Sequence, residues 1–183
     1  MQKIITILAL VVIIAGISNA QETRREVTNF TTTYDDSKPN NDSIPDVYAI
    51  NGKFERIVIL RFKYKADLLE GLNKMVKENN IKNAVILSGI GAVTGYQYHT
   101  VTNSTFPSKN VFVKNPTAPA GITSMNGYII NKRVHAHITF STPDKVFGGH
   151  LEPGTEVFSY AIITIGVLSD DTDLSKIDDK NYR

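Results

Sequence analysis

The chain has 183 residues, a formal net charge of +2 and no cysteine. That length accommodates one ordinary domain with tails, and the lack of cysteine excludes a disulfide framework and a lipoprotein attachment site. Residues 53–168 carry thirteen Lys or Arg against seven Asp or Glu, whereas residues 21–52 and 169–183 are both net acidic. Because the basic residues stand singly, they do not predict a nucleic-acid-binding arm.

Residues 1–20 have the pattern of a secretory signal peptide. Lys3 precedes the apolar run 4–17, which is short for a bilayer span, and the small residues that end at Ala20 form a cleavage site. We therefore predict cleavage after Ala20, a periplasmic or secreted protein, and no membrane span in the mature chain. The polar residues 21–52 are predicted to be a flexible leader, and residues 169–183 a frayed acidic tail.

The domain at 53–168 is predicted to begin with a strand and a helix. The apolar run 56–62 predicts the strand. Asp67 and Glu70 have the spacing of a capping box at the start of the helix, and Asn79-Asn80 marks its end. Between these signals, apolar residues recur at helical spacing; they are Leu68, Leu69, Leu72, Met75 and Val76.

A glycine-rich segment, residues 88–95, follows a predicted buried strand at 84–87. It does not predict a phosphate-binding loop, because it leads into the alternating strand pattern of residues 96–100 and not into a helix, and the lysine of such loops is missing. We expect these glycines to bend the sheet or to let another backbone approach closely.

The rest of the domain reads as strands. Residues 101–120 are predicted to be a loop with one edge strand at 111–113. Segments 122–130 and 133–141 form a hairpin that turns at Asn131-Lys132. Two further strands are predicted at 147–151 and 157–168. One helix and about seven strands predict an α+β domain with one dominant sheet.

Three of the four histidines lie close together in the sequence and suggest a metal site. His135 and His137 share one face of a strand, and the opposite face is apolar (Val134, Ala136, Ile138 and Phe140). His150 follows Gly148-Gly149, which lack the side-chain bulk that would hinder its approach. Three neutral imidazoles with an open position suit zinc, iron or nickel. The alternative is an exposed polar strand face. His99 has no neighbour at ligand spacing, so it is not expected to be a ligand.

The ordered set of segments resembles the PPC ("plants and prokaryotes conserved") domain over residues 54–168. The matching segments are 56–61, 67–70, 86–92, Gly127, 134–138, 146–151, Gly154 and 156–158. The resemblance implies a mixed, mainly antiparallel sheet with one flanking helix, assembled as a homotrimer. It also implies that the strand histidines and the histidine after Gly-Gly lie close together as a metal site.

Three functions are consistent with the sequence. The first is an exported homotrimer that binds a divalent transition metal, preferably zinc, through His135, His137 and His150, with room for a small anionic ligand. The second is a metalloenzyme in which the metal acidifies a water molecule, with Glu152 as the one nearby candidate for a general base. A cupin-type oxygenase is disfavoured, because cupins need a glutamate soon after the His-x-His pair and residues 138–146 contain none.

The third function is DNA binding, which the resemblance implies only through the DNA-binding motifs found beside the domain in plants. In plants the domain accompanies AT-hook motifs, and bacterial members are named largely after that association. This chain has no Arg-Gly-Arg-Pro hook and carries a predicted export signal. Nucleic acid is therefore not an expected partner.

Overall fold

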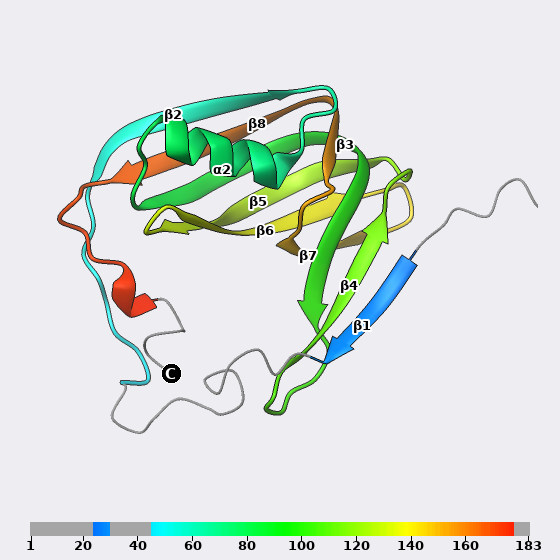
Figure 1. The fold of residues 1–183 in the computed structure, drawn as a ribbon, viewed down its shortest axis with the longest axis horizontal. Coiled ribbons are helices and arrows are strands. Elements are labelled where there is room, and N and C mark those ends of the chain that lie inside the picture. The colour runs from blue at the N-terminus through cyan, green and yellow to red at the C-terminus, as the bar shows by residue number, and fades with distance from the viewer. Residues whose placement is uncertain (1–23, 30–44, 178–183) are drawn as a thin grey trace, which may run out of the picture.

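The computed structural model describes residues 24–29 and 45–177, so the predicted signal peptide lies outside the described residues (Figure 1). A single sheet dominates it. Its strands are β1 (Arg24–Asn29), β2 (Phe54–Lys63), β3 (Ala84–Val101), β4 (Lys109–Asn115), β5 (Ala120–Ile130), β6 (Arg133–Ser141), β7 (Val146–Leu151) and β8 (Glu156–Leu168). The helices are α2 (Leu68–Glu78) and a short 3-10 helix, η2 (Ser175–Ile177).

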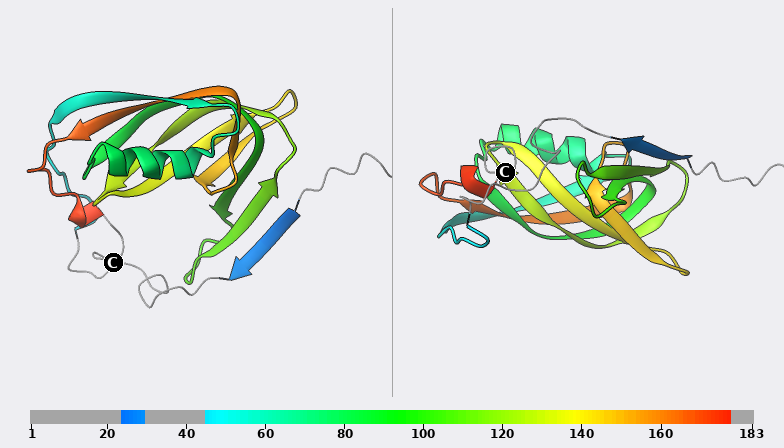
Figure 2. Two further views of the ribbon diagram at one scale, coloured as in Figure 1. Left: turned by 45° about the horizontal axis from the view of Figure 1, so that its top comes forward. Right: turned by 90° about the horizontal axis from the view of Figure 1, so that it is seen from below.

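Helix α2 forms where the sequence predicts it. The Asp67 side chain accepts a hydrogen bond from the Glu70 backbone N–H at 2.9 Å, so Asp67 caps the first turn. Of the predicted apolar stripe, Leu68, Leu72 and Val76 are fully buried against the sheet. The helix lies along one side of the sheet, and within residues 24–29 and 45–177 no other α-helix covers the opposite side (Figure 2).

Strand β3 is longer than predicted. The segments at 84–87 and 96–100 are parts of one continuous strand, because the glycines between them stay hydrogen-bonded to β8 and β5. Gly91 has a φ of +151°, and the pairing with β8 shifts register on either side of it. At Gly95 a side chain would collide with the backbone of Pro116. The predicted bend and close backbone approach are thus both present.

The long β3 brings distant strands together. Its first half pairs with β8 and β5, and its second half pairs with β4 and β7. Because β5 pairs with β6 and β6 with β7, the strands β3, β5, β6 and β7 form a closed ring of pairings. Aromatic side chains pack together on the inside, with ring centroids 4.8–6.3 Å apart; Tyr96, Tyr98 and Phe140 are buried and Phe147 is partly buried.

The predicted α+β class, with one main helix and seven strands over residues 54–168, is confirmed. Strand β1, which pairs with β4, adds an eighth strand from the predicted leader. Every pairing among the described strands is antiparallel, so in this part of the chain the sheet is antiparallel and not mixed.

Packing continues beyond the predicted domain end at residue 168. The Asn83 side chain donates to the Thr172 carbonyl oxygen at 2.9 Å, and Leu174 is buried against Ile130 and Leu168. The first part of the acidic tail is therefore held against the sheet. Within residues 24–29 and 45–177, no helix has the length and apolar character needed to cross a membrane.

Candidate metal centre

All four histidines of the chain gather on the outer face of three neighbouring strands. His137 on β6 lies opposite His150 on β7, and His150 lies opposite His99 on β3. Residues directly opposite in an antiparallel pair project from the same face, so the three imidazoles form a row. His135 lies two residues before His137 and joins it on that face, while Ala136, Ile138 and Phe140 are buried on the other, as predicted.

His150 stands at the centre of this cluster. Its ring centroid lies 4.5 Å from that of His99, 4.9 Å from that of His135 and 5.5 Å from that of His137. The centroids of His135 and His137 are 5.5 Å apart, with nearly parallel rings. Two imidazoles that bind one tetrahedral ion through bonds of about 2.1 Å have centroids about 5 Å apart. The three predicted ligands are therefore neighbours, but among the described residues their donor nitrogens do not form a group that converges within 4.8 Å.

The donor atoms that converge within 4.8 Å of one another belong to a different set. They are contributed by His99, His150 and Glu152. His150 is common to this set and to the predicted trio of His135, His137 and His150. The structure thus places the three predicted ligands close together. It adds two donors, His99 and Glu152, that were not predicted to be ligands.

The glycines before His150 have a clear structural role. A side chain at Gly148 would collide with the carbonyl oxygen of Ile138 on β6, and one at Gly149 with the carbonyl oxygen of His99 on β3. Strand β7 therefore runs close to the backbones of both neighbours. This confirms the expected effect of Gly148-Gly149. Without side chains at these positions, His150 can lie beside histidines of both neighbouring strands, β6 and β3.

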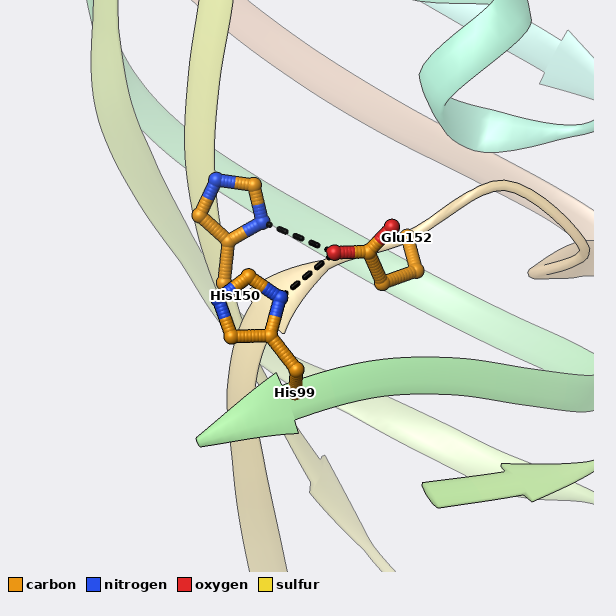
Figure 3. A group of neighbouring side chains, drawn as sticks. All are labelled: His99, His150 and Glu152. Atoms are coloured by element: carbon orange, nitrogen blue, oxygen red, sulfur yellow. Dashed lines mark hydrogen bonds and ion pairs between the residues drawn. The ribbon is translucent and has the colours of Figure 1, made fainter. Parts of the chain in front are cut away.

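Glu152 follows the end of β7 and faces His99 and His150 (Figure 3). Its carboxylate oxygen Oε1 lies 2.5 Å from Nδ1 of His99 and 3.5 Å from Nδ1 of His150. The side chain is 19 % exposed, and its backbone N–H donates to the Gln97 carbonyl oxygen at 3.1 Å. The carboxylate is thus largely shielded from water and has imidazole N–H groups as partners.

The surroundings keep Glu152 ionised. Burial alone would raise the pKa of its carboxyl group, but the hydrogen bonds of His150 and His99 outweigh burial and hold the pKa at about 2. A carboxylate with so low a pKa is a poor proton acceptor at neutral pH. The low pKa favours an orienting or ligating role for Glu152 over the role of general base, for which it was only a candidate.

The electrostatics also favour neutral imidazole at His137. Burial, followed by the charges of His150 and His99, lowers the pKa of His137 below its ordinary value. An imidazole must be neutral to bind a metal ion. The cluster therefore suits metal binding at neutral pH.

His99, which was not expected to be a ligand, stacks on His150. No local pattern marks it, because its partners come from residues about fifty positions further along the chain. The one available signal was Gly149, whose missing side chain is needed for the approach to the His99 backbone. Only the pairing of β3 with β7 reveals this contact.

Several solved structures share this fold. A metal-containing protein from Archaeoglobus fulgidus is 23 % identical, with a TM-score of 0.56; the match covers 69 % of this chain and 89 % of that one. A PPC protein from Pyrococcus horikoshii gives the same identity, TM-score and coverage of this chain, and 87 % coverage of its own. A Bacteroides thetaiotaomicron protein named "putative DNA binding protein" is 20 % identical, with a TM-score of 0.51 and coverages of 68 % and 85 %.

The comparison with curated proteins gives no match. The model of one protein family, the Plants and Prokaryotes Conserved (PCC) domain, matches residues 49–169. That range contains strands β2 to β8, helix α2, the four histidines and Glu152. The chain belongs to the PCC domain family.

Proposed function

We propose that this chain is an exported, homotrimeric PCC-domain protein that binds one divalent transition metal ion, with His135, His137 and His150 as protein ligands. The observation that carries the proposal is the gathering of all four histidines on one outer face, with His150 in ring contact with the other three. Protonation of neighbouring imidazoles would place like charges side by side, whereas a shared metal ion binds them in the neutral form.

The donor set points to a transition metal. Neutral imidazoles suit zinc, and also iron or nickel, whereas calcium and magnesium prefer oxygen ligands. A tetrahedral ion held by three histidines has a fourth position, which takes water or a small anionic ligand. The description of the Archaeoglobus fulgidus protein as metal-containing supports the proposal.

Metal analysis of the purified protein tests the proposal. We expect close to one zinc, iron or nickel ion per chain after loading. His137→Ala should lose most of it, whereas the control Thr139→Val, two residues along the same strand, should keep it. His99→Ala should also keep the ion. Wild-type protein that takes up no metal would overturn the proposal, and loss in His99→Ala but not in His137→Ala would move the ion to His99, His150 and Glu152.

A metal-dependent hydrolase is the second candidate. A metal-bound water at the fourth position becomes acidic and able to attack an ester or amide. Turnover of a substrate panel by zinc-loaded protein, lost in His137→Ala, would establish it. DNA binding is not part of the proposal, because the basic residues of the domain stand singly along the chain. Sub-micromolar DNA binding at physiological salt would contradict that view.

The proposal of a trimer is supported by the side of the sheet that faces away from α2. Large apolar side chains project there from three adjacent strands and are about half exposed or more; they are Ile57 and Ile59 on β2, Phe158 and Tyr160 on β8, and Ile90 on β3, called here the outer apolar face. Patches of this kind usually meet a partner. Light scattering should give three times the chain mass, and a monomer at micromolar concentration would contradict it.

Export is proposed from the sequence of residues 1–20. The mature protein should begin at Gln21 and appear outside the cytoplasm. N-terminal sequencing of protein from fractionated cells tests this. Soluble cytoplasmic protein that retains Met1 would refute export without affecting the metal proposal.

A further inference from the structure

The hydrogen bonds around His150 and His99 fix which ring nitrogen carries the proton. Nδ1 of His150 lies 3.0 Å from the Leu151 carbonyl oxygen, which can only accept, so this Nδ1 carries hydrogen. Nδ1 of His99 lies 2.5 Å from Oε1 of Glu152, an ionised carboxylate that can also only accept. A neutral imidazole holds one proton, so the lone pair of each ring is on Nε2.

We propose that Glu152 is a positioning residue of the metal centre, which holds His99 and His150 in the Nδ1–H form and so presents Nε2 of His150 to the ion. The inference rests on the proposed metal-binding function. In Figure 3 both Nδ1 atoms face Glu152, and the second nitrogen of His150 lies on the side of its ring away from the carboxylate. Metal-bound histidines commonly donate their other N–H to a carboxylate or carbonyl oxygen in this way.

This role excludes a competing arrangement at the same residues. If Glu152 ligated the ion together with Nδ1 of His99 and Nδ1 of His150, both nitrogens would have to lose their hydrogen. The bond from His150 to the Leu151 carbonyl would then be lost, and that oxygen would face a lone pair. The two arrangements therefore differ in the position of a proton as well as in the ligand set.

The turn that carries Glu152 is firmly held. Thr155 is fully buried; its hydroxyl accepts from the Gln97 N–H at 3.0 Å and lies within donating distance of the carbonyl oxygens of Gln97 and Glu152. Asp67 caps α2 with one carboxylate oxygen and accepts from the Gly154 N–H at 2.6 Å with the other. Such support is what a positioning group needs, because its effect depends on a fixed place.

Nitrogen-15 NMR of the metal-free protein at pH 8 tests the proposal independently of metal binding. We expect the Nδ1–H form at both His99 and His150 in wild type. In Glu152→Ala, His99 should shift toward the Nε2–H form, whereas His150 should shift less because Leu151 still accepts its proton. Nε2–H forms at both histidines in wild type would overturn the inference.

Zinc titration and X-ray absorption provide the second test. Glu152→Ala should weaken zinc binding about 10-fold, the lower end of the usual effect of losing an outer-shell partner, because the Leu151 carbonyl still accepts from Nδ1 of His150. Glu152→Gln should recover most of the affinity, because its amide oxygen still accepts. Equal loss in both variants, or a carboxylate oxygen bound to zinc in wild type, would show that Glu152 is a ligand. Wild-type protein that binds no zinc would refute the proposed function, while the NMR result would still decide the role of Glu152.

Discussion

Two exposed regions of the same sheet differ sharply in chemistry. Over β3, β6 and β7 the outer surface is a row of imidazoles beside one carboxylate. Over β2 and β8 the outer apolar face exposes side chains such as Ile59, which is 70 % accessible. Neither surface is typical of an isolated strand face exposed to water. The difference is the basis for proposing two kinds of partner, an ion for the first region and protein for the second.

The largest expected effect is the loss of trimer assembly in a variant that still binds zinc. Ile59→Lys places a charge in the centre of the outer apolar face, where burial at an interface would cost several kcal/mol. We expect light scattering to show monomers while zinc binding by each chain persists. Val47→Lys, a similar change at an exposed residue outside the sheet, is the control. An unchanged mass for Ile59→Lys would place the interface elsewhere.

A change at the diglycine should affect the histidine region and leave the apolar face intact. In Gly149→Ala the new methyl group would collide with the His99 carbonyl oxygen, so β7 and β3 must separate. We expect a loss of about 3 kcal/mol in the free energy of unfolding, measured by urea denaturation, together with weaker zinc binding. Gly121→Ala is the control, because there the methyl group would lie 3.2 Å from the Ser141 hydroxyl and 3.8 Å from its carbonyl oxygen, without a severe collision. Equal effects of the two changes would contradict this account.

The contrast between the regions also separates what the sequence predicts from what it does not. The capping of α2 by Asp67, the hairpin turn at Asn131-Lys132 and the shared face of His135 and His137 depend on neighbours in the chain, and all three are present. These features follow from local backbone geometry and strand parity.

The remaining parts of the site depend on contacts between distant strands. His99 meets His150 because β3 continues through its glycines and pairs with β7, and Glu152 reaches both through a turn held by Thr155. Sequence periodicity carries no information about which strands become neighbours. The predicted trio was therefore incomplete as a description of the cluster, although its three members do lie together.

Acid should weaken the histidine region before it affects the apolar face. The folded-state pKa of His137 is lowered, so its contribution to stability is complete above about 6.5 and is lost as the pH falls below that value. Glu152, with a folded pKa of about 2 against an ordinary 4.5, adds a second loss between those values. We expect the melting temperature of the metal-free protein to fall in both windows.

Variants assign each window to its residue. In His137→Ala the melting temperature should no longer fall in the upper pH range, below about 6.5. In Glu152→Gln it should no longer fall in the lower range, between about 4.5 and 2. Zinc binding should weaken below about pH 6, because protons compete for the imidazole nitrogens. If trimer mass by light scattering falls in the same pH range as zinc binding, the two regions are coupled and do not act independently.

The smallest expected effect concerns the turn behind Glu152. Thr155→Val keeps the shape of a fully buried side chain but removes the hydroxyl that holds Gln97 and the turn. The Gln97 N–H then lacks its acceptor, which should lower the free energy of unfolding by about 1 kcal/mol. Because Glu152 loses part of its support, zinc affinity should also fall a few-fold. Thr123→Val, at an exposed hydroxyl that bonds the Thr139 carbonyl oxygen, is the matched control. Zinc affinity that changes equally in both variants, or in neither, would show that the turn does not position Glu152.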